Sequence, residues 1–374
     1  MTDARVKIPL TKAWIGKDDE AELVRAARRQ AIGEGATTRR FEEQFARFLG
    51  LEGAVATNSC TSALVLALRA LGADGGGEVV LPSYTCLAVL NAVSQVGATA
   101  RLVDNRYDPP AMDYNLTPDL VRPALTPRTR AIIVPHMFGV PAPIDDIVAL
   151  GVPVIEDITL SLGARQQGRL VGSVGAIAVC SFHESKMIAC GEGGMLATSN
   201  PDLLERARYL NSWEAEQAGD RFRDDYPPYE TRYNFHMSEL QAALGLSQLA
   251  KLEDFLERRA DLARRYGARL STIDDVVPPQ GPAGRGNVFF RYLVALRQGD
   301  VVPVLRAFLE VGIEAGRGVF PPLHKVLGQP DGGFPGAERA TKTLISLPLY
   351  PALTDDEVSY ILERSVELLA HAVA

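Results

Sequence analysis

Short apolar runs alternate with longer, helix-like stretches between about residue 53 and residue 198. The runs cover residues 54–56, 79–81, 101–103, 132–134, 154–155 and 176–179. Most of them are rich in β-branched side chains, which is typical of strands that are buried on both faces of a parallel sheet. The pattern therefore predicts an α/β domain with a largely parallel, doubly covered sheet.

The stretch between the first two runs has the apolar periodicity of a helix. Its apolar face extends from Ala63 to Leu71, so residues 58–61 are expected to form the loop at the N-terminus of this helix. Ligands of such sheets bind beyond the carboxyl ends of the strands, and both Asp157 and Ser181 stand where an apolar run ends. These two residues are therefore expected to share one pocket.

Two further regions flank the sheet-forming part of the chain. The pattern predicts helices at residues 18–30, 41–49, 301–311 and 357–370, a turn at residues 33–35 and a strand at residues 288–294. Ser238 and Gln241 have the spacing of a capping box, ahead of a long helical pattern that runs to Phe255. The change of pattern predicts an N-terminal arm and large domain over residues 1–250 and a smaller α+β domain over residues 251–374.

Composition narrows the range of functions. With 374 residues, of which 47% are hydrophobic, the chain can bury a large core. Its net charge of -7 and scattered Lys and Arg residues argue against nucleic acid as a partner. No apolar stretch has the length of a membrane span or of a signal core, so a cytoplasmic location is expected. The four cysteines form no CxxC pair, so neither a disulfide nor a bound metal is expected.

Lys186 has the surroundings of a lysine that binds an aldehyde cofactor. It follows the apolar run ending at Ser181 and precedes a glycine-rich turn at residues 191–194. Pyridoxal 5'-phosphate is held by a lysine amine as a Schiff base, and a carboxylate beside its pyridine nitrogen keeps the ring protonated. Asp157 is the candidate for that carboxylate, because a charge at the end of a buried strand is costly unless it is paired. Taken singly, the lysine is also compatible with a solvated loop residue and the aspartate with a helix cap.

The loop before the first helix of the sheet region offers donors for a phosphate. The amides of Cys60 and Thr61 would lie at a helix N-terminus, where backbone N–H groups are free and the helix dipole favours an anion. The hydroxyl of Ser181 could add another donor. A plainer interpretation stays open for this segment, in which Ser59, Thr61 and Ser62 only cap the helix.

These features belong to a set of short motifs that is distributed over almost the whole chain. The set comprises Phe41-Glu42, Ser59-Cys60-Thr61-Ser62-Ala63-Leu64, Pro82-Ser83-Tyr84-Thr85, Val154-Ile155-Glu156-Asp157, Ser181-Phe182-His183 with Lys186, and Gly191-Glu192-Gly193-Gly194-Met195, followed by residues 233–243 and 321–324. Together they resemble the DegT/DnrJ/EryC1/StrS aminotransferases, also called sugar aminotransferases. The resemblance implies the aspartate-aminotransferase fold, fold type I, with a mostly parallel seven-stranded sheet and a smaller C-terminal α+β domain.

The resemblance also implies roles for individual residues. Lys186 would form the imine with pyridoxal 5'-phosphate, and Asp157 would pair with the ring nitrogen. Ser181 and the amides of Cys60 and Thr61 would hold the phosphate. Asn234 would reach the phosphate bound by a neighbouring subunit, so the active unit is expected to be a twofold homodimer with shared sites.

Three positions depart from the family pattern. Where the family has Gln or His three residues after the aspartate, this chain has Leu160, which cannot donate a hydrogen bond to the cofactor. Where many members place an aromatic ring against the pyridine face, this chain has Cys86, a thinner and polarizable contact. His236 stands where Arg is common. Contacts at the cofactor are therefore expected to differ from those of other members.

The resemblance favours transamination. Glutamate or glutamine would donate an amino group to a nucleotide-linked keto sugar or to an aminocyclitol-type precursor, in secondary metabolism or in the synthesis of cell-surface sugars. A second hypothesis keeps the cofactor but assigns elimination, cyclisation or another step on a natural-product intermediate, because of Leu160 and Cys86. A third, a non-enzymatic partner subunit or sensor, is disfavoured by the presence of both Lys186 and Asp157. Specificity is expected from loops such as residues 316–320, and His324 is either a substrate contact or a solvated loop histidine.

Overall fold

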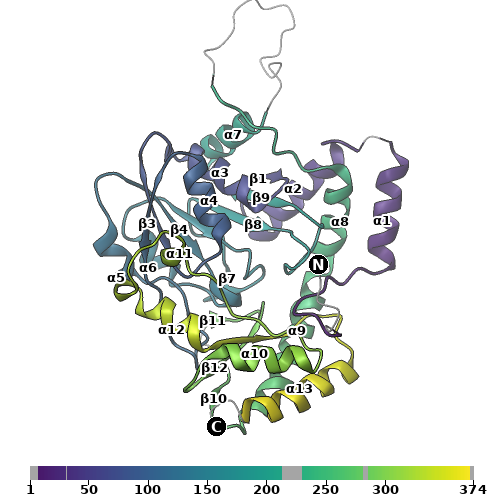
Figure 1. Cartoon of the computed structure of the whole chain (residues 1–374). Coiled ribbons are helices and arrows are strands. Elements are labelled where there is room, and N and C mark those ends of the chain that lie inside the picture. The colour runs from purple at the N-terminus through teal and green to yellow at the C-terminus, as the bar shows by residue number, and fades with distance from the viewer. Residues whose placement is uncertain (1–6, 31, 213–229, 281–284, 371–374) are drawn as a thin grey trace, which may run out of the picture.

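A seven-stranded sheet forms the centre of this computed structural model, which describes residues 7–30, 32–212, 230–280 and 285–370 (Figure 1). The strand order is β1-β9-β8-β5-β4-β2-β3. The strands are β1 (Gly53–Thr57), β2 (Glu78–Pro82), β3 (Thr99–Val103), β4 (Thr129–Pro135), β5 (Val154–Asp157), β8 (Ile177–Ser181) and β9 (Gly194–Thr198). Neighbouring strands are parallel except for β9, which is antiparallel to both β1 and β8. The predicted largely parallel sheet is confirmed, although β9 did not stand out among the apolar runs.

Helices cover both faces of this sheet. They are α3 (Cys60–Ala70), α4 (Leu87–Gln95), α5 (Pro118–Val121), α6 (Ile144–Val148) and α7 (Pro201–Leu210), with the 3-10 turns η1 (Arg122–Ala124) and η2 (Met137–Gly139). Consecutive strand residues enter different cores, because side chains alternate along a strand. In β2, Val79 and Leu81 pack in the core that holds α3 and α4, whereas Val80 packs in the core that holds α5 and α6. This double burial explains the runs of apolar residues in the central strands.

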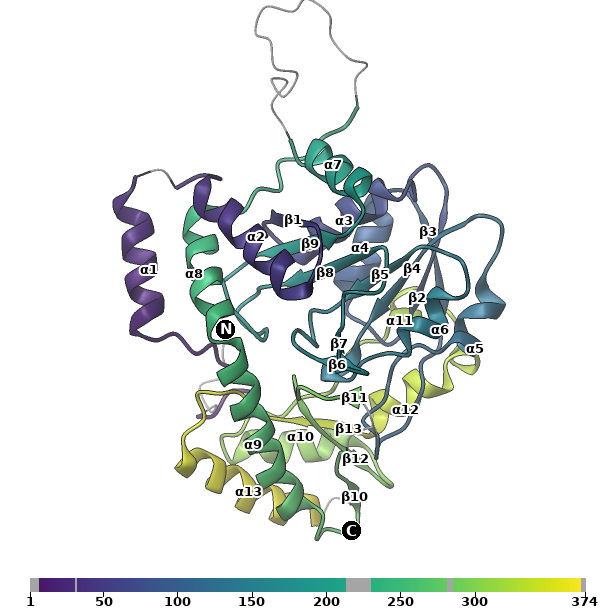
Figure 2. The ribbon, with the colours of Figure 1, turned by 180° about the vertical axis from the view of Figure 1, so that it is seen from behind.

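The N-terminal arm packs against the long helix that follows the sheet. It consists of α1 (Lys17–Arg28) and α2 (Ala36–Leu49), and both contact α8 (Glu239–Ala250), as Figure 2 shows. The buried carboxylate of Glu239 accepts the amide hydrogens of Thr37 and Thr38, which closes the N-terminus of α2. The two predicted helices are confirmed, but α2 begins at Ala36 because this carboxylate caps it from a distant part of the chain.

The C-terminal part has its own small sheet and core. Its elements are α9 (Leu252–Leu270), β10 (Val276–Val277), β12 (Tyr292–Leu296), α10 (Val301–Glu310), α11 (Leu323–Val326), η4 (Asp331–Gly333), α12 (Pro335–Thr343), β13 (Leu344–Leu347) and α13 (Asp355–Ala370). A further sheet joins β6 (Arg165–Gln166) and β7 (Arg169–Leu170) with β11 (Arg285–Gly286). The predicted capping box at Ser238 is confirmed, and the helical pattern after it breaks between α8 and α9. The division of the chain near residue 250 stays a prediction.

The strand predicted at residues 288–294 is wrong in its first half, since β12 begins only at Tyr292. The side chain of Asn287 accepts the amide hydrogen of Phe289 at 2.7 Å, and Phe289 has a positive φ of 48°. A side chain that takes over a backbone hydrogen bond competes with strand pairing. Within the described residues, no helix combines the length and apolar character needed to cross a membrane.

Candidate active site

Asp157 and Ser181 lie next to each other at the carboxyl ends of two paired strands. Asp157 ends β5 and Ser181 ends β8, and the register pairs Asp157 with Val179. Both side chains are largely buried, with 7% and 9% exposure. The predicted proximity of the two residues is thus present in the structure, at the edge of the sheet where α/β proteins bind ligands.

Thr159 connects the elements that meet at this edge. Its amide donates to Oδ1 of Asp157 at 3.0 Å, and its hydroxyl oxygen accepts the amide hydrogen of Ser181 at 3.1 Å. The same hydroxyl lies 3.5 Å from Sγ of Cys60. Sequence reasoning missed this residue. The signal was present, because a polar residue two positions after a strand-end aspartate is placed to form an Asx turn.

The carboxyl group of Asp157 lies in an environment that disfavours its charge. Burial raises its pKa above the ordinary value of 3.8, while hydrogen bonds from Thr159 and the positive charge of Lys186 act in the opposite direction. The burial effect dominates, so the chain's own residues do not fully compensate this carboxylate. A bound cationic group would supply the missing partner for its negative charge.

Lys186 lies in the hairpin loop that joins β8 to β9. The loop is closed by backbone hydrogen bonds from Phe182 to Gly193 and from Glu184 to Gly191, each of 2.9 Å. The side chain of Lys186 is half-buried, and its Nζ lies 5.5 Å from the ring centroid of Phe290. The glycine-rich turn predicted from the sequence therefore holds the lysine loop at its base.

The N-terminus of α3 retains free amide donors. Ser59 is the N-cap, and its hydroxyl oxygen accepts the amide hydrogen of Ser62. No acceptor among the described residues takes the amide hydrogens of Cys60 and Thr61. The capping interpretation is therefore correct for Ser59, but it does not use up the two donors that an anion would need.

Gly194 fixes the position of this helix end. A Cβ atom at Gly194 would lie 2.4 Å from the backbone of Ser59 and 2.5 Å from the amide nitrogen of Cys60. Only glycine allows such an approach. Since Gly194 pairs with Ser181 across β8 and β9, this contact aligns the amides of α3 with the end of β8.

Two of the three departures from the family pattern, Cys86 and Leu160, occupy different surroundings. Cys86 is the N-cap of α4 and is exposed. Leu160 is half-buried and packs against the core that lies between the sheet, α2 and α8. Neither side chain can donate a strong hydrogen bond to a ligand.

Asn234 is exposed in a segment that lies against the α3 loop. The rings of Tyr233 and Phe235 on either side of it stack, with centroids 4.5 Å apart. The carbonyl of Phe235 accepts the amide hydrogen of Asn58 at 2.7 Å. The side chain of Asn234 is thus free of the core and close in space to the α3 N-terminus, while the shared site stays a prediction.

His324 is buried, with a partner on each ring nitrogen. Its Nδ1 lies 2.6 Å from Oγ of Ser83, its Nε2 lies 3.1 Å from Glu338, and its ring stacks on Phe334. The solvated loop histidine is wrong, because the side chain has 0% exposure. The substrate contact at His324 stays a prediction, although both ring nitrogens already have partners within the chain.

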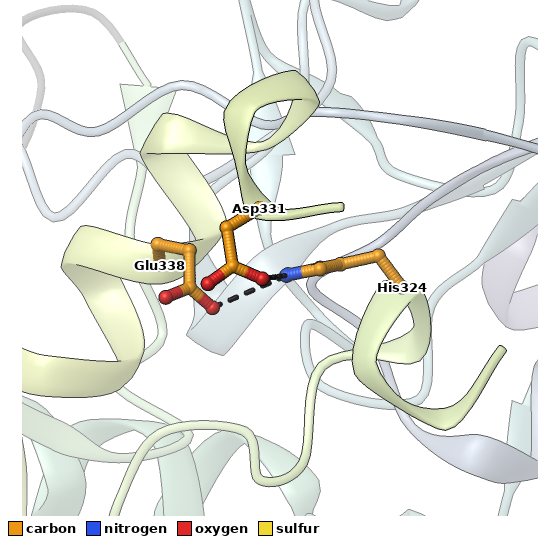
Figure 3. A group of neighbouring side chains, drawn as sticks. All are labelled: His324, Asp331 and Glu338. Carbon is orange, nitrogen blue, oxygen red and sulfur yellow. Dashed lines mark hydrogen bonds and ion pairs between the residues drawn. The ribbon is translucent and has the colours of Figure 1, made fainter. Parts of the chain in front are cut away.

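His324, Asp331 and Glu338 also form a group whose ligand atoms are close enough to hold a metal ion (Figure 3). Lys325 already lies in this group, with its Nζ 2.5 Å from Asp331 and 3.3 Å from Glu338. An ammonium group at this place neutralises the carboxylates in the way a metal would. The arrangement is therefore that of an ion-pair network between α11, η4 and α12.

A separate cavity of about 810 Å³ opens between α2, β1 and the end of α7. Glu42 is part of its lining, and burial raises the pKa of this carboxyl to about 7. One oxygen of Glu42 accepts the amide hydrogen of Ala56 at 2.7 Å, so the side chain ties α2 to β1. None of the predicted site residues lines this cavity.

Known proteins resemble this chain over nearly its whole length. A profile of the DegT/DnrJ/EryC1/StrS aminotransferase family matches residues 14–365. A dTDP-4-dehydro-2,3,6-trideoxy-D-glucose 4-aminotransferase of Saccharopolyspora spinosa is 33% identical, over 92% of this chain and 92% of its own length. The crystal structure of the aminotransferase TlmJ from Streptoalloteichus hindustanus is 32% identical with a TM-score of 0.89, covering 98% of this chain and 100% of that one. Spr1654 from Streptococcus pneumoniae in its PLP form has the same fold, with a TM-score of 0.88 at 24% identity and 98% and 100% coverage.

Proposed function

This chain belongs to the DegT/DnrJ/EryC1/StrS aminotransferase family, and from this premise we propose that it transfers an amino group from glutamate or glutamine to a nucleotide-linked keto sugar or an aminocyclitol-type precursor. The predicted family and fold type I architecture are confirmed. Members of the family are pyridoxal-phosphate-dependent enzymes that transfer amino groups, so the chain is an enzyme of this class. The donor and the acceptor are the parts that we add.

Pyridoxal phosphate would supply an aldehyde that takes up the amino group and a ring that accepts electrons from the reacting carbon. The residues at the sheet edge fit this group. The free amides of Cys60 and Thr61, with the hydroxyl of Ser181, would hold its phosphate. The carboxylate of Asp157 would hold the ring nitrogen, since its raised pKa reflects burial without a full partner.

Lys186 would carry the covalent link and later move the proton at its Nζ. For proton transfer, an amine must be near the reacting carbon and must lose its charge. The half-buried position beside the ring of Phe290 keeps part of the solvent away from Nζ. Closure of the loop by the glycine turn keeps the lysine at a defined place relative to Asp157.

The observation that carries this proposal is the convergence of three elements on one strand edge through Thr159. Asp157, Ser181 and Cys60 come from β5, β8 and α3, and Thr159 contacts all three. The electrostatic influence of Lys186 on Asp157 adds the β8–β9 loop. We also propose that the active unit is a homodimer, since the exposed Asn234 lies in the segment beside the α3 loop.

The test uses purified protein loaded with pyridoxal phosphate. The visible cofactor band should change when glutamate or glutamine is added, and borohydride followed by peptide mapping should fix the cofactor on Lys186. Lys186→Ala should lower turnover by at least about 1,000-fold, whereas Lys12→Ala, at an exposed lysine, should leave it unchanged. A label on another residue would contradict the assignment.

Leu160 and Cys86 are the reason to consider a second function, because neither provides the polar or aromatic contact to the cofactor that is usual in the family. That function is elimination, cyclisation or another step on a natural-product intermediate. It would be favoured if the cofactor band responded to candidate substrates but never to an amino donor. A response to a donor favours transamination.

A further inference from the structure

Two positive groups lie on the same aromatic ring beside the proposed site. The Nζ of Lys186 is 5.5 Å from the ring centroid of Phe290, and the guanidinium carbon of Arg291 is also 5.5 Å from it. Phe290 itself is 4% exposed, so both cations contact a buried ring. Arg291 therefore lies only one side chain away from the lysine that would carry the chemistry.

Arg291 has no carboxylate partner within the part of the chain that the structure describes. Among the described residues, its one polar contact is a weak hydrogen bond of 3.3 Å from Nη1 to Oγ of Ser346. Burial lowers the pKa of this guanidinium, while the electrostatic influence of Tyr84 and Glu314 acts in the opposite direction. A guanidinium has five donors, so most of the hydrogen-bonding capacity of Arg291 remains for a ligand.

A second guanidinium close by shows what a satisfied buried arginine looks like in this protein. Nη1 of Arg259 donates to the carbonyl oxygens of Phe289, Phe290 and Leu349, at 3.2, 3.1 and 2.8 Å. Burial, followed by the charge of Arg291, lowers the pKa of Arg259 to about 10. The carbonyls hold this charge but do not neutralise it, so Arg259 and Arg291 together make the region positive.

The position of Arg291 is also suited to contact a substrate. Its Nη1 lies 4.0 Å from the place of a Cβ on Gly316, at the start of the loop from which acceptor specificity is expected. That loop is bound to the large sheet through Tyr84, whose hydroxyl accepts the amide hydrogen of Val319 at 3.1 Å. Arg291 is half-buried, so part of its side chain remains accessible to an anion.

We propose that Arg291 binds a carboxylate of the amino donor, which makes it a specificity-determining residue for the first half of the reaction. This inference rests on the proposed function. The planar guanidinium fork matches a carboxylate in a bidentate arrangement, and the excess positive charge favours an anion over a neutral group. A donor amino acid has its carboxylates within a few bonds of the reacting amine. The diphosphate of a nucleotide-linked acceptor lies beyond the sugar ring, and one free guanidinium is a small site for it.

The experiment measures binding of glutarate, a dicarboxylate that has no amine and cannot react, to the cofactor-loaded protein by titration calorimetry. Arg291→Gln should weaken glutarate binding by at least about tenfold. Arg291→Lys should give an intermediate loss, because an ammonium keeps the charge but lacks the fork. Arg306→Gln is the matched control, since Arg306 is exposed on α10. Glutaramide, the neutral diamide, should not distinguish wild type from Arg291→Gln.

Each outcome decides the proposal. Equal glutarate binding by wild type and Arg291→Gln would overturn it, and so would a wild-type protein that does not bind glutarate at millimolar concentration. Thermal unfolding and cofactor uptake of Arg291→Gln should match those of wild type, which excludes misfolding as the cause of a loss. If glutarate binding depends on Arg291 but no amino donor changes the cofactor band, the carboxylate site stands and the proposed transamination fails. The reverse result leaves transamination intact and removes Arg291 from it.

Discussion

Glu156 and Asp157 are neighbours in β5, yet they occupy opposite kinds of environment. The carboxylate of Glu156 is fully buried and accepts hydrogen bonds from His136 at 2.9 Å and from the amides of Gly172, Val174 and Gly175. Burial raises its pKa, but the bond from His136 and those from the amides outweigh this effect and hold the pKa below 4.5. For Asp157, the effect of burial is larger than that of the hydrogen bonds and nearby charges, so the pKa is raised. The chain's own hydrogen-bond donors compensate the burial of the Glu156 carboxylate, but they do not fully compensate the burial of Asp157.

The same contrast separates Arg259 from Arg291. Arg259 is surrounded by carbonyl oxygens, whereas Arg291 keeps most of its donors without a partner among the described residues. In both pairs, the satisfied member is bonded to groups of the chain itself, and the unsatisfied member lies beside the proposed site: Asp157 at the end of β5, and Arg291 on the ring that Lys186 also contacts. Buried charges without partners cost stability, so their presence at one place points to a ligand that completes them.

The largest expected effect is that of Asp157→Asn on turnover. This change should lower turnover by about 1,000-fold, equivalent to about 4 kcal/mol of transition-state stabilisation, because a neutral amide cannot keep a pyridine nitrogen protonated. The raised pKa means that the ionised form costs stability at neutral pH. Urea unfolding of the cofactor-free variant at pH 7 should therefore give an unchanged or higher free energy of unfolding. A less stable variant would show that Asp157 is a structural carboxylate after all.

The next effect in size concerns Glu156. Glu156→Gln should lower the free energy of unfolding at pH 7 by about 3 kcal/mol, because the amide group places a donor where backbone N–H groups need an acceptor. A lowered pKa gives a contribution to stability that is present above the unfolded value and is lost as the pH falls through the folded value. The difference between wild type and variant should thus shrink below pH 4.5.

The control for this prediction is turnover. Glu156→Gln should change it only modestly when it is measured per folded molecule with saturating cofactor. A loss as large as that of Asp157→Asn would erase the proposed distinction between the two neighbours. The two isosteric changes, one residue apart, are thus expected to act on different properties.

The smallest expected effect tests whether the hydrogen bonds of His324, like those of Glu156, stabilise the fold. A double-mutant cycle of Ser83→Ala and His324→Ala should give a coupling of about 1 kcal/mol in the free energy of unfolding, because the two side chains share a buried hydrogen bond of 2.6 Å. Michaelis constants for donor and acceptor should change only a few-fold. Additive single effects would show that the hydrogen bond does not stabilise the fold, and a large rise in the Michaelis constant for one substrate would support the predicted substrate contact of His324.

Much of the fold was predictable because most strands of the large sheet are buried on both faces and contain runs of apolar residues. Six of the strands in the large sheet stood out in this way, while β9 did not. Errors occurred where a side chain replaced a backbone partner. Asn287 delays the start of β12, and Glu239 extends α2 towards its N-terminus. Such bonds join residues that no local pattern connects.

Some site residues could be recognised from local motifs, whereas others could not. The chain's own motifs single out Lys186 and Asp157, because their residue types and their places after apolar strands point to one kind of chemistry. Thr159, His324 and Arg291 gain their meaning only from contacts made in three dimensions.

Sequence alone determined the sheet, the family and the two residues on which the proposed chemistry depends, since these follow from local periodicity and short motifs. Tertiary structure decided which buried polar groups find hydrogen-bonding or charged partners within the chain and which remain available to bind a ligand. Ser83 and His324, for example, are 241 residues apart and still share a hydrogen bond. Whether a charge is satisfied depends on all groups within a few ångströms of it, and most of these come from distant parts of the chain.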